Sequence, residues 1–161
     1  MNVFVALPLE VRLAGLFVVG VVAGGLANLA IYRLAWNVRA ISPWSRPDEK
    51  APRRRWSDRL PVVGWFGLRR EAPLHGRGHW IRPMLVELLC GVGLAALYWW
   101  EVDQWGLVRR GAPAWLALGP QLHVQFAVHA ALIWLMLVAS LIDADEKTIP
   151  DSITVPGTLF G

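Results

Sequence analysis

Cysteine is almost absent from this 161-residue chain, and that near-absence excludes two kinds of covalent stabilisation. Cys90 stands alone in an apolar run, so the chain can form neither an internal disulfide nor a cysteine metal cluster. We interpret it as a small buried or lipid-facing residue rather than a reactive thiol. The sequence also lacks a phosphate-binding glycine loop and a recognisable Ser-His-Asp arrangement. The N-terminus has no basic stretch or small-residue cleavage site, so we expect its apolar run to be retained as a membrane span.

Apolar residues dominate what is present. They make up 55% of the chain, which includes ten tryptophans, and such a composition does not suit a water-soluble surface. Three apolar runs are long enough, or nearly long enough, for the ~20 residues that a helix needs to cross a bilayer. The sequence therefore predicts an all-α, polytopic transmembrane protein with a cytoplasmic loop domain between its first two spans.

The predicted segments follow from these runs and from the breaks between them. A glycine-containing run lies between Arg12 and Arg33, a second run ends on the aromatic group Tyr98, Trp99 and Trp100, and a third precedes an acidic stretch. The apolar residues after Pro150 suggest a fourth span that is cut off early. We expect a first transmembrane segment at 1–36, a basic cytoplasmic loop at 37–83, a second transmembrane segment at 84–100, an external loop at 101–121, and the third segment, acidic motif and start of a fourth span at 122–161.

Basic charge is concentrated in one segment. Residues 37–83 contain eleven Lys/Arg and four Asp/Glu, while the rest of the chain is net acidic. A basic patch can bind nucleic acid, but between two apolar runs it favours a cytoplasmic loop under the positive-inside rule. Six prolines exclude a long helix there, and we expect Trp44, Trp56, Trp65 and Trp80 to hold the loop together with its charges. This orientation brings the end of the third span to the cytoplasmic face.

The third span ends in the acidic stretch LIDADEKTIPD, residues 141–151. Its carboxylates are Asp143, Asp145, Glu146 and Asp151, and they are either a solvated helix end or a chemical site. Asp145 is only two residues from Asp143 and would point away from it if the helix continues. Ser140 lies three residues before Asp143, so its hydroxyl could hydrogen-bond that carboxylate.

Two polar residues interrupt the first two spans. Asn28 is either a hydrogen-bonding residue at a helix interface or a participant in catalysis. Glu87 could extend to the cytoplasmic surface, pair with Arg82 or Arg33, or orient a substrate.

Two histidines lie on or near the third span. His123 and His129 are six residues apart and therefore on different helix faces. We interpret them as interface or packing residues in preference to proton carriers.

Four blocks of the sequence, in order, resemble the type IV prepilin leader peptidases, a family of membrane aspartic peptidases. LIDADEKTIPD is similar to the first active-site motif of that family, with Asp143 at the catalytic position and Asp151 in the downstream IPD triplet. GGLANLAIYRL (24–34) resembles the first-helix sequence GSFLNVVIYRL and places Asn28 in register. LPVVGWFGLRR (60–70) resembles IPLLSWLLLRG, and WIRPMLVELL (80–89) is similar to ISWRYPLVELL with Glu87 on its glutamate. The resemblance implies that Asp143 is catalytic and that Asp151, Glu87 and Asn28 support it or position the substrate.

The sequence departs from the family pattern at two places. Many members carry two CxxC pairs in the loop, thought to bind zinc, whereas this chain has ISPWSRP and RREAPLHGRGHW there. Tetrahedral zinc needs about four ligands, and the loop offers only His75 and His79, so we expect no metal site. The family's second catalytic aspartate, in a GxGD motif, has no counterpart. Because aspartic peptidase chemistry needs two carboxylates, we expect this sequence to be the N-terminal part of a longer enzyme.

The resemblance implies an aspartic endopeptidase, a hydrolase of the type IV pilus or type II secretion systems. It would cleave the leaders of prepilins or pseudopilins at the cytoplasmic face of the inner membrane, as a multi-pass protein whose partners are its substrate and the lipid bilayer, with no nucleic acid. Cleavage requires no cofactor, whereas the N-methylation that follows in many members uses S-adenosylmethionine. The alternative is a truncated, non-catalytic membrane protein that binds pilin or assembly components. A lipid-binding anchor would explain the basic loop but not the four blocks.

Overall fold

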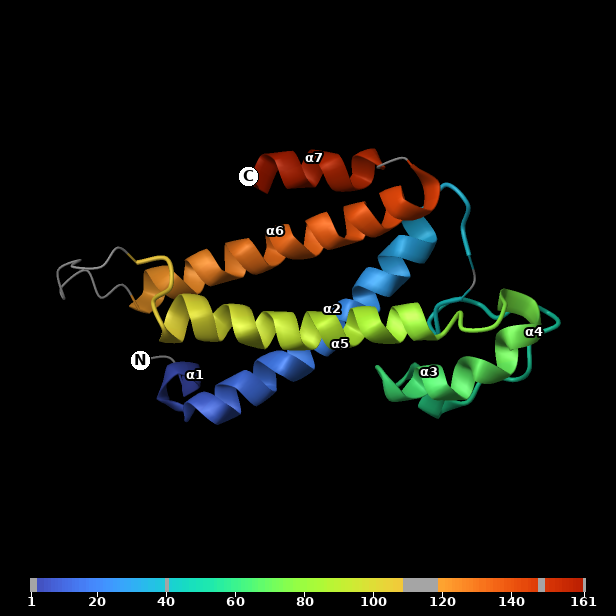
Figure 1. The fold of residues 1–161 in the computed structure, drawn as a ribbon, viewed down its shortest axis with the longest axis horizontal. Helices are drawn as coiled ribbons and strands as arrows, with labels where there is room; N and C mark the ends of the chain where they lie inside the picture. Colours follow the sequence, from blue (N-terminus) through green and yellow to red (C-terminus); the bar gives the residue numbers. More distant parts are fainter. Residues whose placement is uncertain (1–2, 40, 109–118, 148–149, 161) are drawn as a thin grey trace.

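A computed structural model describes residues 3–39, 41–108, 119–147 and 150–160, and within these ranges the chain is helical and contains no strand (Figure 1). The elements in chain order are α1 (Val3–Ala6), α2 (Leu9–Leu34), the 3-10 turn η1 (Trp56–Arg59), α3 (Val63–Leu68), the 3-10 turn η2 (Arg69–Glu71), α4 (Ala72–His75), α5 (Ile81–Tyr98), the π turn η3 (Trp99–Asp103), α6 (Gly119–Glu146) and α7 (Asp151–Phe160).

Three helices are long and apolar enough to cross a membrane: α2, α5 with its π extension, and α6. The predicted fold class, an all-α protein with transmembrane helices, is confirmed. Helix α5 begins at Ile81, three residues before the predicted span, because Pro83 lies in its first turn, where a missing backbone N–H breaks no helical bond. It continues beyond residue 100 through η3 to Asp103. Most of the predicted external loop, residues 109–118, lies outside the described residues.

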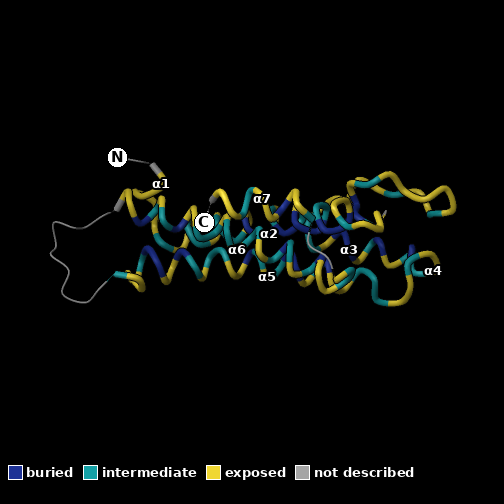
Figure 2. Tube along the Cα trace, turned by 90° about the horizontal axis from the view of Figure 1, so that it is seen from above, coloured by how far each residue is buried: buried dark blue, intermediate teal, exposed yellow. Residues whose placement is uncertain are grey.

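The helices form a bundle in which α2 crosses α5, α6 lies beside both, and α7 folds back along α6 (Figure 1). The core between them is made of small and branched residues, which include Ala27, Ile31, Val86, Val138 and Ile142. Figure 2 shows buried residues along the inside of the bundle and exposed residues along its outer faces. Much of the exposed surface of the long helices is apolar, as a lipid-facing surface requires.

The end of α2, the start of α5 and the end of α6 meet at one end of the bundle (Figure 1). The described residues between α2 and α5, 35–39 and 41–80, lie at this end, and we call them the loop domain and this the loop-domain end. At the opposite end lie the start of α2, η3 and the first turns of α6. The acidic end of α6 and the basic loop domain are therefore on the same side.

Buried ion pairs, rather than four packed tryptophans, hold the loop domain. Trp65 is 1% exposed, but Trp44 is 55% and Trp56 is 75% exposed, so the predicted packing role of these two is wrong. In their place, Glu71 and Asp58 are buried and bind Arg54 and Arg70. A short, proline-rich segment offers little apolar core, and these charge-assisted hydrogen bonds supply part of the missing contacts.

Candidate functional site

The last turns of α6 carry three carboxylates at the helix end where they are least favourable. Asp143, Asp145 and Glu146 lie within the final turn, and the negative end of the helix dipole disfavours anions there by roughly 0.3–1 kcal/mol each. Helix stability therefore does not explain them. Their side chains must be accounted for by tertiary contacts or by function.

Asp145 is used to dock α6 on α5. Its Oδ1 lies 2.5 Å from Nη1 of Arg82, and Nη2 of the same arginine donates to the Leu141 carbonyl at 3.1 Å. Arg82 thereby binds a carboxylate and a backbone carbonyl in the last turns of α6. Of the alternatives considered for Glu87, pairing with Arg82 is not observed, because this arginine binds Asp145.

Glu146 is used to dock α6 on the end of α2. Its carboxylate accepts hydrogen bonds from the backbone N–H groups of Trp36 and Asn37, the second at 2.8 Å. Helix α6 ends at Glu146, and the next residue, Lys147, adopts a left-handed conformation with φ 56° while its N–H donates to the Asp143 carbonyl at 2.7 Å. Asp145 and Glu146, the other two carboxylates of this helix end, therefore both have structural partners.

Asp143 is the carboxylate that remains. Its side chain is exposed and has no hydrogen bond or ion pair with any residue that the structure describes. The preceding Ile142 is fully buried, so the backbone that carries Asp143 is fixed in the core while the carboxylate points outward. Ser140 is exposed as well, and no hydrogen bond joins it to Asp143. The geometry thus separates one available carboxylate from two that are occupied.

Asp151 begins α7, on the far side of residues 148–149, and it is exposed. No described contact joins its side chain to Asp143. Asp145 is held by Arg82 on α5, so it does not share a proton with Asp143 either. Within the described ranges, Asp143 has no second carboxylate at hydrogen-bond distance.

Glu87 and Asn28 form a buried polar junction between α2, α5 and the loop domain. Glu87 is 3% exposed and accepts from the Trp65 indole at 2.8 Å, from the Val62 N–H at 2.5 Å and from Asn28 Nδ2 at 3.3 Å. Asn28 Nδ2 also donates to the Pro83 carbonyl at 2.8 Å. These contacts match the structural interpretation of Asn28. For Glu87, they replace the alternative of a pair with an arginine, because a backbone N–H, an indole and an amide are its donors.

Small residues let α2 approach α5 closely at this junction. A Cβ at Gly24 would lie 2.5 Å from Glu87 Cα, and one at Gly20 would collide with the Cys90 carbonyl. Such glycines permit close helix packing in lipid. The same close approach brings Asn28 of α2 within hydrogen-bond distance of Glu87 on α5.

The loop-domain segments that correspond to the family's CxxC pairs meet around a guanidinium. Arg54 donates to the carbonyls of Ser42 and Ser45 at 2.8 and 2.9 Å, and it binds both Glu71 oxygens at 2.8 Å. His75 lies 3.4 Å from the same carboxylate. This donor set does not fit zinc, because a permanent cation already stands between the carboxylate and the carbonyls. Sequence reasoning missed the cluster because its residues come from three separate segments, 42–45, 54 and 71–75, and arginines are plentiful in this loop.

The opposite end holds a second polar cluster. Tyr98 is fully buried; its hydroxyl accepts from Arg12 at 2.8 Å and lies 3.1 Å from His123 Nε2. Glu101 Oε1 lies 2.8 Å from His129 Nδ1. Both histidines of α6 thus face α5, which agrees with packing roles.

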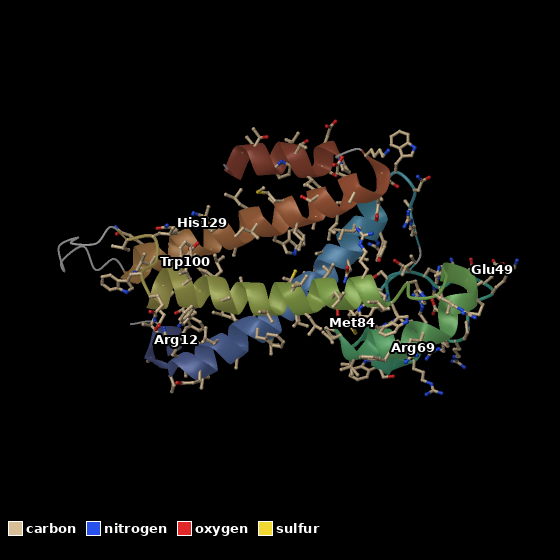
Figure 3. All side chains as sticks on the ribbon, viewed as in Figure 1. Arg12, Glu49, Arg69, Met84, Trp100 and His129 are labelled. Atoms are coloured by element: carbon tan, nitrogen blue, oxygen red, sulfur yellow. The ribbon has the colours of Figure 1, made fainter. Side chains whose placement is uncertain are left out.

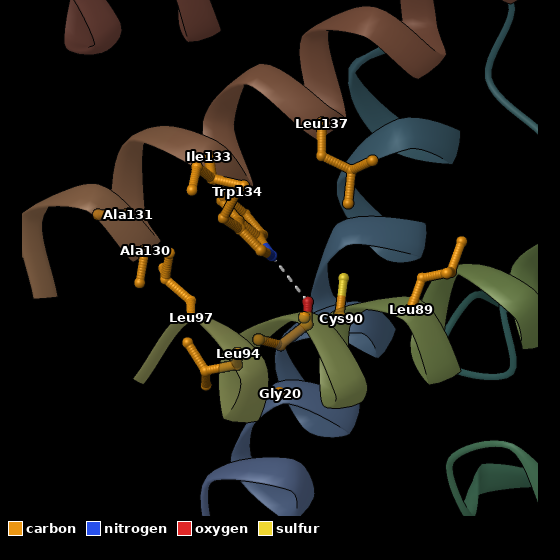
Figure 4. Close-up of a pocket in the computed structure, with 12 residues that line it drawn as sticks. Gly20, Leu89, Cys90, Leu94, Leu97, Ala130, Ala131, Ile133, Trp134 and Leu137 are labelled. Atoms are coloured by element: carbon orange, nitrogen blue, oxygen red, sulfur yellow. Dashed lines mark hydrogen bonds between the residues drawn. The ribbon is translucent and has the colours of Figure 1, made fainter. Parts of the chain in front are cut away.

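An apolar cavity of about 560 Å³ separates α6 from α2 and α5 (Figure 4). Leu94, Leu97, Ile133 and Leu137 contribute to its wall, and Trp134 donates to the Ala23 carbonyl at 2.8 Å beside it. A second cavity, next to Glu87, has only about 70 Å³. Neither combines size with polar groups in the way that S-adenosylmethionine would require, so no methyl-donor site is assigned to the described residues.

Comparison with known proteins yields one matching family and several relatives. The family described as "Bacterial Peptidase A24 N-terminal domain" matches residues 18–101. Proteins named "Prepilin leader peptidase/N-methyltransferase" are 28% identical over 146 residues in Myxococcus xanthus, 28% over 174 in Neisseria gonorrhoeae and 29% over 180 in Dickeya chrysanthemi. These alignments cover 91%, 92% and 94% of this chain but 38%, 53% and 56% of the relatives. The chain therefore spans about half the length of these curated relatives or less. No solved structure gives a significant match.

Proposed function

Because the chain belongs to the family of the bacterial peptidase A24 N-terminal domain, we propose that it carries one half of an aspartic endopeptidase site that removes leader peptides from prepilins or pseudopilins. Asp143 is one catalytic carboxylate. The second comes from outside the described residues, in the same or another polypeptide. The printed names of the relatives support the substrate class.

One observation carries the proposal: of the three carboxylates in the last turn of α6, Asp143 alone has no partner among the described residues. A peptidase carboxylate must be free to share a proton with its partner, so that one group activates water while the other protonates the scissile carbonyl. Asp145 and Glu146 fix the end of α6 through Arg82 and the backbone after α2. They hold the Asp143 backbone without occupying its carboxylate.

The membrane placement supports the same function. Eleven basic residues in 37–83 favour a cytoplasmic loop domain, and the end of α6 lies at that end of the bundle. We place the protein in the inner membrane as a multi-pass protein, with Asp143 at the cytoplasmic surface. A prepilin would there present the boundary between its charged leader and its apolar helix. Asp151, Glu87 and Asn28 support this site from α7 and from the buried junction. The loop domain is held by Arg54 without zinc, and methyl transfer is not included because no described cavity suits the donor.

The test is a prepilin-cleavage assay of the protein produced from its native gene, in a host without its own leader peptidase. Asp143→Asn removes the ionisable group and should abolish cleavage, whereas Asp145→Asn, two residues away on the same turn, should retain it. Protein levels in the membrane, measured by immunoblot, separate lost chemistry from lost folding. Cleavage by the Asp143→Asn variant at the wild-type rate would overturn the proposal.

The absence of a second carboxylate next to Asp143 in the described ranges favours one alternative, a non-catalytic membrane protein that binds pilin or assembly components. Prepilin that is co-purified with the wild-type chain but never cleaved, with or without Asp143, would support it.

A further inference from the structure

The loop domain contains an apolar element that is bracketed by two arginines. Residues 60–68, LPVVGWFGL, carry no charge, and Arg59 and Arg69 flank them. The element is too short to cross a bilayer, but its length is close to that of an interfacial or re-entrant segment. Leu60, Val63 and Phe66 are 41%, 64% and 50% exposed. Val63 and Phe66 are three residues apart on α3 and so lie on one face.

This element lies beside the transmembrane helices at a depth that a bilayer would occupy. The small cavity that Leu60 and Pro61 help to form is lined on its other side by Val22 and Leu26 of α2. At 1.5 Å per residue, these two positions lie about 16 and 10 Å along α2 from Arg33, the basic residue at its loop-domain end. On α5, the contact residue Glu87 lies about 8 Å along the helix from Arg82. The positions on α2 and α5 that adjoin residues 60–68 therefore lie within the apolar helices, about 8–16 Å from the arginines at their loop-domain ends.

The backbone at the start of α3 has the hydrogen bonding that this depth demands. In hydrocarbon, each unpaired N–H costs several kcal/mol, so irregular backbone persists there only with internal partners. The Val63 and Gly64 N–H groups donate to the carbonyls of Pro61 and Leu60, at 2.6 and 2.8 Å, and proline has no N–H. Val62 has φ 62°, and its N–H donates to the Glu87 carboxylate in place of a backbone carbonyl. A carboxylate on a transmembrane helix therefore completes the pairing of this turn.

Two arginine–tryptophan pairs mark where the element meets polar surroundings. The Arg59 guanidinium lies 5.6 Å from the Trp44 ring, and the Arg69 guanidinium lies 5.0 Å from the Trp80 ring. Trp80 in turn contacts Phe66, with ring centroids 5.3 Å apart. Trp80 thus lies between the apolar side chain of Phe66 and the cation of Arg69. Tryptophan and arginine take these positions at membrane interfaces.

We propose that residues 60–68 form a re-entrant element inserted among the acyl chains of the leaflet at the loop-domain end. Leu60, Val63 and Phe66 contact lipid, continuous with the exposed apolar surface of Val22 and Leu26 on α2. Glu87 accepts the hydrogen bond of the Val62 N–H in the turn, and Arg59 and Arg69 bind phosphate headgroups. The inference is independent of the proposed peptidase activity. It makes the loop domain partly a membrane structure.

The test measures the surroundings of single spin labels in the complete chain reconstituted into phosphatidylethanolamine–phosphatidylglycerol vesicles. In a Cys90→Ala background, labels at Val63→Cys and Phe66→Cys are compared with Leu26→Cys as the lipid reference. Leu74→Cys is the matched control, an exposed apolar position of the same domain beyond Arg69. Glu49→Cys, at the outer tip of the loop domain (Figure 3), is the aqueous reference. Collision rates with oxygen, which is enriched in lipid, and with a water-soluble nickel chelate report each environment.

Labels at Val63 and Phe66 are expected to collide with oxygen as often as the Leu26 label and to be protected from nickel, while those at Leu74 and Glu49 are open to nickel. Nickel access at Val63 and Phe66 equal to that at Glu49 would place the element in water and overturn the proposal. Protection from both reagents would show that protein covers this face and would overturn it too. A lipid-like Leu26 label in the same preparation shows that the bundle is folded and inserted.

Discussion

Helix α5 and its continuation η3 each bury a glutamate, and the two glutamates differ in how completely they are hydrogen-bonded. Glu87, at the loop-domain end, and Glu101, at the opposite end, are both 3% exposed. Both oxygens of Glu87 are bonded, by two side chains and a backbone N–H. Glu101 has one bonded oxygen, on His129, while its Oε2 is buried without a hydrogen-bond partner among the described residues. Although the two glutamates are equally buried, we expect the stability of the fold to depend more on Glu87 than on Glu101.

The difference shows which end of the bundle is more tightly determined. At the loop-domain end, Glu87, Asp145 and Glu146 connect α2, α5, α6 and α3, so the elements around Asp143 are joined by several independent bonds. At the opposite end, the contacts of Tyr98 and Glu101 with histidines join α5 to α6, and Arg12 adds α2. An active site that needs a fixed carboxylate is better placed at the first end.

The largest expected effect comes from Glu87→Leu. The substitution leaves the Val62 N–H and the Trp65 indole without acceptors, at about 1–3 kcal/mol for each buried donor, so unfolding should become easier by about 2–6 kcal/mol. Glu101→Leu is the matched variant at the opposite end. It loses one bond and also removes an unpaired oxygen, so its cost should be about 1 kcal/mol or less. Titration with dodecyl sulfate, followed by circular dichroism, measures both.

Equal destabilisation by the two leucine variants would contradict the comparison between the two ends. It would mean that the additional hydrogen bonds of Glu87 contribute no more stability than the single bond of Glu101.

Arg54→Met tests whether ion pairs within the loop domain stabilise it independently of its contacts with α5. The change leaves the buried Glu71 with only His75 nearby, and we expect a loss of about 3 kcal/mol, because removing one partner of a buried pair exposes the cost of burying the other. Protease cleavage between α2 and α5 in native membranes reports it. Arg70→Met, whose side chain is more exposed, is the control and should have a smaller effect. Equal cleavage of the two variants would argue against a central role for Arg54.

Gly24→Ala should have a smaller effect, since it adds one methyl group at the closest approach of α2 and α5. The new Cβ would meet the backbone of Glu87, which cannot move aside as a flexible side chain could, and overpacking of this kind costs about 1–3 kcal/mol. Gly93→Ala, in the half of α5 toward the opposite end, adds a methyl group where no atom lies within 4 Å. It should leave stability unchanged or raise it by up to about 1 kcal/mol. The same dodecyl sulfate titration distinguishes them, and a neutral Gly24→Ala would show that the helices can separate freely.

The sequence alone could predict three long apolar helices, the polar character of the loop and the position of Asp143 at the same end of the bundle as that loop. These follow from hydrophobic length, basic charge and the parity of the crossings, none of which needs contact information. The partners of Glu87 could not be predicted, because a valine with positive φ leaves no signal in the sequence and the indole comes from a segment 22 residues away. Trp44 and Trp56 were expected in a core because tryptophan is apolar; their exposure is consistent with an interfacial position.

The smallest expected effect on stability is that of Asp143→Asn, and its size tests whether Asp143 has a structural partner. Asp143→Asn removes a charge from the negative end of the α6 dipole and breaks no described contact, so the free energy of unfolding should change by less than about 0.5 kcal/mol. Asp145→Asn gives up the ion pair with Arg82, which is partly exposed, and should cost about 0.5–1 kcal/mol. Thermal unfolding in nanodiscs can rank the two. If Asp143→Asn is the more destabilising, Asp143 has a structural partner, and the argument that its carboxylate is kept free for chemistry loses its basis.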